Sequence, residues 1–527
     1  MIIIERLPHA KNASYITRQV PNNEEPQGCM AGTREQILDE LEAWAIDDTA
    51  PKVCWLNGMA GTGKTSIAHT LSERLNEKQM LGASFFCSRS ASQEVRDASF
   101  IIPTIAAKLS QASPPLRSAM IQTIEKEPDV GSMRTLSNQF HLLLADPIQR
   151  AFGLSVKIYK IVVIDALDEC INLGTVEKFV QAVVDYTPAM PLKFIVASRV
   201  TPQIQKAFHH NPEHPPKTVS LHDVERAIVQ GDIRTYLQSS LSEIVRGSEQ
   251  ALFWPPPDEL EILLERSDRL FIYAATAVRY IGAPEVDFRE RLKHITRLTP
   301  ARMQTGVIDS LYNDIMRQAF HWELEPEEVS RRHETLSAIV LVLVPLPVDT
   351  IACLMGMDTL QVQVALSPFR SVIQMPTVDT SPVTIFHASF PQFVLDPSRC
   401  EKHHLDVSEG DQNLAVKCLR WLNHTLKRNI CNLDKNMTPE PNAIPEALWY
   451  SCLHWASHLA HALAGALAQT LVTELRDLVS EFVNDHLLHW FECLSALREL
   501  ESGIKSLDTA NEAISVSIQL SRIKNTE

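Results

Sequence analysis

A glycine-rich segment near residue 60 limits the folds open to this chain more than any other feature. Residues 58–65 read Gly-Met-Ala-Gly-Thr-Gly-Lys-Thr, the complete pattern GxxxxGK[ST]. Glycines let the backbone curl until its N–H groups converge on a phosphate at a helix N-terminus. An apolar run over residues 53–56 precedes the pattern, and helical spacing over residues 66–77 follows it. The sequence therefore predicts a strand, a phosphate-binding loop and a helix.

The residues of this loop have expected roles toward a bound nucleotide. Lys64 would reach the β- and γ-phosphates, and the Thr65 hydroxyl would ligate Mg²⁺. The loop backbone and the first helical turn would supply the remaining contacts, at Gly58, Ala60, Gly61, Thr62, Gly63 and Ser66. A chance glycine-rich turn is the alternative, but the strand and helix around the pattern argue against it.

A second apolar strand, predicted over residues 161–164, ends in the acidic residue Asp165. Ligands of open α/β sheets bind at the carboxyl ends of the strands, so Asp165 is expected to hold Mg²⁺ through water. Asp168 and Glu169 follow closely. Either carboxylate could orient or deprotonate an attacking water, which makes both candidate catalytic residues. The alternative is that the two acids only cap the next segment.

A third strand, predicted over residues 194–197, is followed by Ser198 and Arg199. Arg199 lies 199 − 165 = 34 residues past Asp165, about the length of one βαβ unit. The tip of this strand is therefore expected beside the metal site. Arg199 could stabilise charge on the γ-phosphate, which makes it the third candidate catalytic residue. A surface arginine at a strand end is the alternative.

The wider pattern predicts an α/β domain followed by helical ones. Short strands that alternate with helices over residues 51–223 indicate a parallel sheet flanked by helices. Residues 1–50 contain a further expected helix, which Thr33 and Gln36 would begin as a capping box. Beyond the sheet we expect a helical domain at 224–330, a winged-helix domain at 331–400 and an all-helical domain at 401–527.

Composition and charge narrow the classes of function. The chain has 49 basic and 64 acidic residues, a net charge of −15 that repels phosphate backbones, so we expect no nucleic-acid partner. Its apolar stretches fall short of the ~20 residues that a spanning helix needs, so we expect no membrane partner. The ten cysteines are scattered without a CxxC pair, a pattern typical of free thiols in a cytoplasmic protein. We interpret His454, His458 and His461 as core or surface residues.

The sequence resembles a known family at the motifs described above. LNGMAGTGKTS (56–66), IVVIDALDEC (161–170) and FIVASR (194–199) look like the NACHT class of STAND P-loop NTPases, and within it the nephrocystin-type proteins abundant in fungi. The small Ala166 and the acidic pair after it are what separate that class from other P-loop groups. The resemblance covers most of the chain, including CMAGTREQIL (29–38), LFIYAATAVRYI (270–281), LYNDIM (311–316), FHASFPQFVLD (386–396) and HLLHWFECLSAL (486–497).

The resemblance implies a signalling switch that alternates between a compact ADP-bound state and an open, self-associating ATP-bound state. ATP or ADP with Mg²⁺ would be the cofactors, with GTP as an open alternative, and hydrolysis would be slow. The partner would be another copy or an effector or sensor protein, because we find the core of an NLR-like receptor without a repeat sensor.

Three further residue assignments depend on the same resemblance. In relatives, the segment 29–38 forms part of the adenine side of the pocket. A winged-helix histidine that touches the ADP β-phosphate in the wider class matches His387. The chain departs from the class where many members carry a Gly-Leu-Pro turn on the base. Arg269-Leu270-Phe271 stands there instead, which leaves adenine specificity from that contact open.

Two other functions compete with the switch. A nucleotide-binding scaffold without turnover is compatible with the sequence, because no arginine finger can be named and hydrolysis without one is slow, on the order of 10⁻⁴–10⁻² s⁻¹. An unrelated P-loop enzyme is disfavoured, because the NKxD motif of GTPases and the LSGGQ motif of ABC ATPases are both absent.

Overall fold

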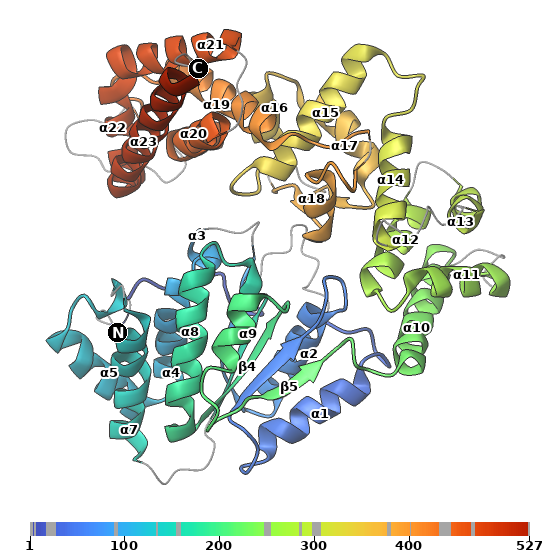
Figure 1. The fold of residues 1–527 in the computed structure, drawn as a ribbon, viewed down its shortest axis with the longest axis vertical. Coiled ribbons are helices and arrows are strands. Elements are labelled where there is room, and N and C mark those ends of the chain that lie inside the picture. The colour runs from blue at the N-terminus through green and yellow to red at the C-terminus, as the bar shows by residue number, and fades with distance from the viewer. Residues whose placement is uncertain are drawn as a thin grey trace. The chain divides into compact units, whose positions relative to one another are not determined.

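The computed structural model divides the chain into two compact units, Met1–Leu311 and Tyr312–Glu527, which we describe separately (Figure 1). The domain boundaries expected within these units stay predictions. The structure describes residues 4, 7–16, 28–88, 93–132, 135–153, 160–246, 254–283, 287–297, 307–376, 381–400, 402–431, 444–464 and 469–524.

The first unit contains a five-stranded sheet in the order β2-β3-β4-β1-β5. All four neighbouring pairs are parallel, which confirms the predicted α/β class. The strands are β1 (Val53–Asn57), β2 (Leu81–Phe86), β3 (Lys160–Asp165), β4 (Leu192–Ser198) and β5 (Lys217–Ser220). Strand β5 was not predicted, because this short edge strand buries only Val219 and carries little apolar signal.

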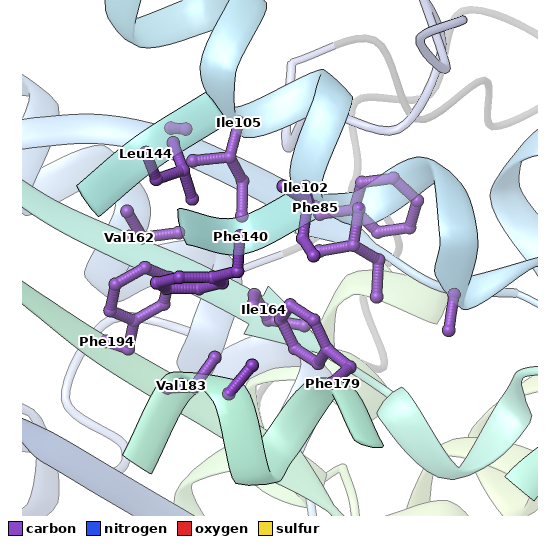
Figure 2. Packing of buried hydrophobic residues seen from close by; sticks show 14 of the residues in the cluster. Phe85, Ile102, Ile105, Phe140, Leu144, Val162, Ile164, Phe179, Val183 and Phe194 are labelled. Atoms are coloured by element: carbon purple, nitrogen blue, oxygen red, sulfur yellow. The ribbon is translucent and has the colours of Figure 1, made fainter. Parts of the chain in front are cut away.

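Alternate side chains of the central strands pack on opposite faces of the sheet. Val162 and Ile164 of β3 join the core under α4 (Ile101–Ala112), α6 (Leu136–Phe140) and α8 (Leu173–Tyr186), as Figure 2 shows. Ile161 and Val163 join a second core with α1 (Glu35–Ile46) and α2 (Lys64–Glu77) on the other face. The unit is therefore a sheet between two helical layers, and the near-continuous apolar runs in the sequence follow from burial on both faces.

The helices of the first unit surround this sheet and continue beyond it. They are α1 (Glu35–Ile46), α2 (Lys64–Glu77), α3 (Gln93–Arg96), α4 (Ile101–Ala112), α5 (Pro114–Lys126), α6 (Leu136–Phe140), α7 (Asp146–Phe152), α8 (Leu173–Tyr186) and α9 (Pro202–Phe208). After β5 come α10 (Arg226–Ile244), α11 (Pro257–Ser267), α12 (Phe271–Gly282), α13 (Phe288–Arg297) and α14 (Val307–Ala319), the last of which contains the division between the units.

The apolar spacing over residues 260–281 predicts helix, and the chain forms two helices there, α11 and α12. The break between them falls at Asp268 and Arg269, whose φ angles are 36° and 68°. Two consecutive residues in the left-handed region cannot continue a right-handed helix. The apolar periodicity was continuous across the break because both helices bury the same kind of side chain.

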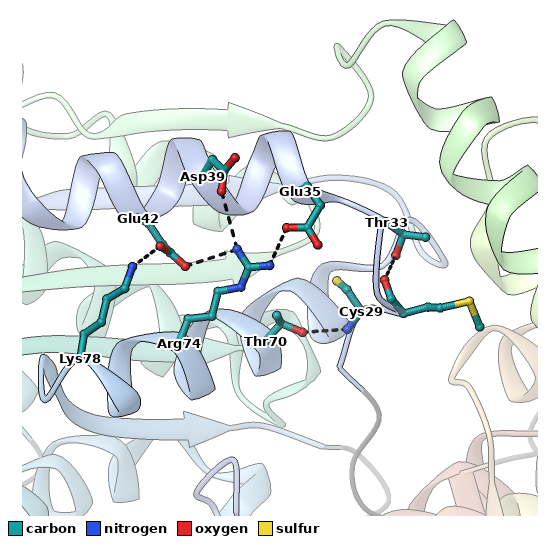
Figure 3. Close-up of polar contacts among 9 residues, drawn as sticks. Cys29, Thr33, Glu35, Asp39, Glu42, Thr70, Arg74 and Lys78 are labelled. Atoms are coloured by element: carbon teal, nitrogen blue, oxygen red, sulfur yellow. Dashed lines mark hydrogen bonds and ion pairs between the residues drawn. The ribbon is translucent and has the colours of Figure 1, made fainter.

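Helix α1 is held against α2 by a cluster of charges (Figure 3). The Arg74 guanidinium on α2 lies 2.6 Å from Glu35, 3.7 Å from Asp39 and 3.4 Å from Glu42. The three acids are spaced along one side of α1, so a single arginine reaches all of them. This cluster joins the N-terminal segment to the phosphate-binding helix.

The expected capping box at the start of α1 is wrong. The Thr33 hydroxyl donates to the carbonyl of Met30 at 2.7 Å, as Figure 3 also shows. Arg34 is the N-cap residue, with φ of 60° and no hydrogen bond from its side chain to the helix backbone. The side chain of Arg34 is used elsewhere, at the phosphate-binding loop.

The second unit is predominantly helical. Its helices are α15 (Pro326–Leu341), α16 (Val348–Met355), α17 (Thr359–Leu366), α18 (Ser389–Val394), α19 (Val407–Thr425), α20 (Glu446–Ala464), α21 (Gln469–Glu481), α22 (Leu487–Leu497) and α23 (Leu500–Lys524). Helices α15 to α17, with the antiparallel strands β6 (Ile373–Gln374) and β7 (Thr384–Ile385), supply the three helices and small hairpin expected of a winged helix. In the described part of both units, no helix is long and apolar enough to span a bilayer.

A buried polar network crosses the second unit between α19 and α20. The Leu343 N–H donates to the Tyr450 hydroxyl at 3.2 Å, and the same hydroxyl lies 2.6 Å from His458 Nε2. On the other side of the ring, His458 Nδ1 lies 2.6 Å from a carboxylate oxygen of Asp411. His458 is wholly buried, which agrees with its interpretation as a core histidine. His461 lies 3.3 Å from the other Asp411 oxygen.

This network predicts a loss of stability in acid. Burial alone would raise the pKa of Asp411, but its bonds to His458 and His461 outweigh burial and hold the pKa below its usual value. A lowered carboxyl pKa stabilises the fold above the unfolded pKa, and that contribution disappears as the pH falls through the folded one. We expect Asp411→Asn to cost about 2 kcal/mol at pH 7 and progressively less as the pH falls through the folded pKa of Asp411.

Urea denaturation from pH 7 to pH 3 would measure this difference. Asp477→Asn, which removes a charge from an exposed position on α21, is the matched control. A cost for Asp411→Asn that stays constant over the whole range would contradict the assignment of the charge to the folded state.

Candidate functional site

The phosphate-binding loop connects β1 to α2 at the carboxyl edge of the sheet. Gly61 and Gly63 have φ angles of 76° and 91°, values that residues with a side chain rarely adopt. Gly63 is the N-cap of α2, and Lys64, Thr65 and Ser66 form its first turn. The backbone N–H groups of this turn have no earlier helical carbonyls to bond, and they are the groups that the pattern predicts to bind phosphate.

Lys64 lies over the loop and faces acidic residues from the next strands. Its Nζ donates to the carbonyls of Gly58 at 2.8 Å and Met59 at 2.9 Å. Burial lowers the pKa of Lys64, and the carboxylates of Asp168 and Asp165 oppose that shift. The ammonium is therefore close to both acids, as expected from a loop and two strand ends at one edge of the sheet.

The order of the strands explains this convergence. β4 lies between β3 and β1, with Asn57 of β1 opposite Ser198 of β4. Arg199 directly follows β4, so the structure places it between the phosphate-binding loop and the acids after β3. The role of Arg199 beside a metal stays a prediction.

Asp165 ends β3 and is wholly buried. The backbone turns sharply after it, because Ala166 has a φ of 53° and is followed by a short 3-10 turn, Leu167–Glu169. A left-handed conformation tolerates a small side chain better than a branched one. Because residue 166 is small, the chain can make this turn, which brings Asp168 and Glu169 back toward the loop.

Asp168 is engaged by Arg199 through both of its oxygens. The Arg199 backbone N–H donates to Oδ1 at 2.8 Å, and its Nε lies 3.2 Å from Oδ2. Asp168 is only 5% exposed, whereas Glu169 is partly accessible. The two acids that the sequence left interchangeable therefore have different surroundings. Asp168 contacts Arg199, and Glu169 is the more accessible of the two acids.

The residues around Asp165 fit a magnesium ion. Mg²⁺ prefers oxygen ligands and keeps several waters when it binds together with a nucleotide phosphate. The Thr65 hydroxyl and the Asp165 carboxylate are oxygen donors at adjoining ends of α2 and β3. Among the described residues, no group of three or more His, Cys, Asp or Glu side chains could itself hold a metal ion.

Arg34 is a buried residue that contacts the loop, and no sequence motif predicted this contact. Its Nη2 donates to the Thr62 carbonyl at 2.8 Å, and its guanidinium lies 4.7 Å from the centre of the Phe271 ring. Burial lowers the pKa of Arg34, with Asp232 opposing that shift from 3.9 Å. The segment 29–38, expected on the adenine side, thus does contact the loop within the first unit.

Helix α12 also contacts the loop directly. The Ile272 N–H donates to the Gly61 carbonyl at 3.2 Å. A Cβ atom on Gly61 would lie 2.0 Å from Ile272 Cγ2, far inside van der Waals contact. The turn of Asp268 and Arg269 just before α12 brings this helix end to the loop. The positions that depart from Gly-Leu-Pro therefore lie at the phosphate-binding loop.

His387 belongs to the second unit, and its predicted contact with ADP stays a prediction. Its Nδ1 accepts the Ser389 backbone N–H at 3.1 Å. The proton of the neutral ring is consequently on Nε2, which suits that atom to donate to an anion. The Ser389 hydroxyl lies 2.7 Å from the same Nδ1 and 2.8 Å from the Tyr312 hydroxyl.

The first unit is similar to a known protein family. A family model described as "Nephrocystin 3, N-terminal" matches residues 32–199, the part that contains α1, the loop and Arg199. The vegetative incompatibility protein HET-E-1 of Podospora anserina is 22% identical over 510 residues, 89% of this chain. The chain spans 35% of the length of that relative.

Two solved structures share parts of the fold at low similarity. A STAND protein with a tetratricopeptide repeat sensor from Pyrococcus horikoshii is 14% identical, with a TM-score of 0.40, over 93% of this chain and 65% of that one. A Drosophila ORC structure bound to DNA is 13% identical, with a TM-score of 0.30, over 59% of this chain and 74% of that one. Both TM-scores are below 0.5.

Proposed function

We propose that the chain, whose first unit is similar to the nephrocystin-type NACHT domain of the STAND class, acts as a nucleotide-dependent signalling switch. The observation that carries the proposal is the meeting of three strand ends at one edge of the sheet. The loop that holds Lys64 follows β1, Asp165 ends β3, and Arg199 follows β4 and pairs with Asp168. This arrangement provides for phosphate, metal and water at one edge of the sheet.

Each residue of the site would have a different role in binding and hydrolysis. Lys64 and the loop backbone would bind the β- and γ-phosphates of ATP, while Thr65 and Asp165 would hold Mg²⁺. Bound Mg²⁺ supplies neutralisation of charge on the phosphate oxygens. Glu169 would position or deprotonate the attacking water, and Arg199, held by Asp168, would stabilise charge on the γ-phosphate.

The loop's contacts to helical elements suggest how nucleotide state is transmitted. Arg34 and Ile272 bond to the carbonyls of Thr62 and Gly61, so movement of the loop displaces α1 and α12 directly. We propose that ADP favours a closed state to which His387 contributes, and that ATP favours an open state that self-associates or binds an effector. A ligand can shift such an equilibrium only by its difference in affinity for the two states.

Hydrolysis tests the division between the two acids. We expect Glu169→Gln to retain Mg·ATP binding and to slow single-turnover hydrolysis at least about a hundredfold, because only water activation is lost. Asp168→Asn should weaken the hold on Arg199 and reduce hydrolysis less. Quenched-flow assays with radiolabelled ATP would measure both rates, with the exposed loop variant Glu213→Gln as control.

Two outcomes of this assay would change the proposal. A Glu169→Gln protein that hydrolyses normally while Asp168→Asn does not would transfer the general base to Asp168. Normal hydrolysis in both variants, or none in the wild type, would favour a nucleotide-binding scaffold without turnover.

A further inference from the structure

A cavity in the second unit lies between helices α15 and α19, apart from the residues of the proposed nucleotide site. The two helices touch at Gly410, where a Cβ atom would lie 2.2 Å from Leu341 Cδ1 and 2.5 Å from Ser337 Oγ. Beside this close contact a space of about 470 Å³ opens, lined by both helices and by Phe320 and His403. A volume of this size is typical of small-molecule sites.

A buried hydroxyl at the cavity has no partner in the part of the chain that the structure describes. Ser337 is 8% exposed and lines the space, yet its side chain makes no hydrogen bond there. The hydroxyl oxygen is not among the fully buried atoms that lack a partner, so a water or a ligand in the cavity can reach it and bond to it. It can therefore serve as a polar anchor for an occupant.

One wall of the cavity is a stack of flat rings. Phe320 and His403 lie 4.7 Å apart with an angle of 16° between their planes, and His333 meets Phe320 edge-on at 6.3 Å. Burial, with His333 and Lys402 nearby, lowers the pKa of His403 below its usual value, so His403 is neutral at pH 7. The wall thus presents aromatic faces and adds little positive charge.

The charged residues of the lining are all acidic. Glu334 accepts from the Ser330 hydroxyl at 3.1 Å, and Asp406 caps α19 by accepting from the Glu409 N–H at 2.9 Å. Glu409 is the third carboxylate, and the lining includes no lysine or arginine. The lining therefore combines negative charge with an aromatic wall and a hydroxyl, which suits a planar cation.

We propose that this cavity binds a small organic cation that carries a flat group, such as an amidinium or guanidinium joined to a ring. The ring would lie along the wall of Phe320 and His403. The cationic end would face Glu334 and Glu409, and one of its N–H groups would donate to the Ser337 hydroxyl. The site is independent of the nucleotide proposal, because none of its lining residues is among those proposed to bind nucleotide or metal.

Three probes of almost equal shape test the charge that the cavity selects. Benzamidine is the cation, benzamide its neutral analogue and benzoate the anion. We expect benzamidine to bind the full-length protein with a dissociation constant on the order of 1 mM, as fits so small a ligand. Benzamide should bind more weakly and benzoate should not bind. Titrations followed by saturation-transfer NMR would give the three constants.

Two matched variants test the location. Glu409→Gln should weaken benzamidine binding about fivefold, the effect of losing one partly exposed ion pair. Glu481→Gln changes the net charge equally at an exposed position on α21 outside the lining, and should leave binding unchanged. Equal or stronger binding of benzoate, no binding of benzamidine up to 10 mM, or equal effects of the two variants would each overturn the proposal.

Discussion

Replacing Lys64 by alanine is expected to abolish the stabilisation that Mg·ATP gives to the wild-type protein. That stabilisation amounts to about 2.7 kcal/mol when ATP is at a hundredfold excess over its dissociation constant. Lys64 has no substitute at the loop, because the other cations near it, Arg34 and Arg199, are held by Thr62, Asp232 and Asp168. Thermal unfolding with and without Mg·ATP and Mg·ADP would measure the loss.

The apo protein should tolerate this change. The Lys64 ammonium donates only to the loop carbonyls of Gly58 and Met59, so its removal leaves the core of the sheet intact. Lys206→Ala removes an exposed ion pair with Glu177 and should keep the full nucleotide effect. If Lys64→Ala and wild type gained equal stability from Mg·ATP, phosphate binding at this loop would be refuted.

The local parts of this site could be predicted from sequence because their physics is local. A loop that cradles phosphate needs glycines at fixed spacing between a strand and a helix, and residues 58–65 satisfy this within one segment. Asp165 and Arg199 were predicted as strand ends, and the parallel sheet brings such ends to a common edge. Topology, rather than residue type alone, made these predictions succeed.

The contacts that the sequence did not reveal join segments far apart in the chain. Arg34 bonds to Thr62, and Asp168 bonds to Arg199, through geometry that no periodic pattern encodes. The break before α12 was missed because Asp268 and Arg269 adopt left-handed conformations that their residue types do not announce. The acidic pair after Asp165 stayed interchangeable for the same reason, since burial and partners alone separate Asp168 from Glu169.

The contact between Gly61 and Ile272 is the most direct link between the phosphate-binding loop and a helix beyond the sheet. The Gly61 carbonyl accepts the Ile272 N–H, and the absence of a side chain on Gly61 leaves room for the Ile272 side chain. A switch needs such a contact, because phosphate bound on one side of the loop must alter packing on the other. The loss of stability on placing a side chain at position 61 therefore measures how closely α12 packs against the loop.

Gly61→Ala is accordingly expected to lower the free energy of unfolding by about 2–4 kcal/mol. Roughly 1 kcal/mol is the cost of a side chain at φ of 76°, and the remainder comes from overlap with Ile272. Gly63→Ala separates the two terms, because Gly63 has an equally unfavourable φ of 91° but nothing within 4 Å of its Cβ. That variant should cost only the conformational part. Urea denaturation of the apo proteins would measure each cost.

The double variant Gly61→Ala with Ile272→Ala tests whether the overlap is the cause. Removing Ile272 Cγ2 relieves the closest contact, so the double variant should cost about 1–2 kcal/mol less than the sum of the single ones. Such coupling would be absent if Gly61→Ala acted through backbone strain alone, and Gly61→Ala and Gly63→Ala would then be equally costly. Coupling of the expected size would instead establish that α12 is seated on the loop by this pair, so that displacement of either element must be felt by the other.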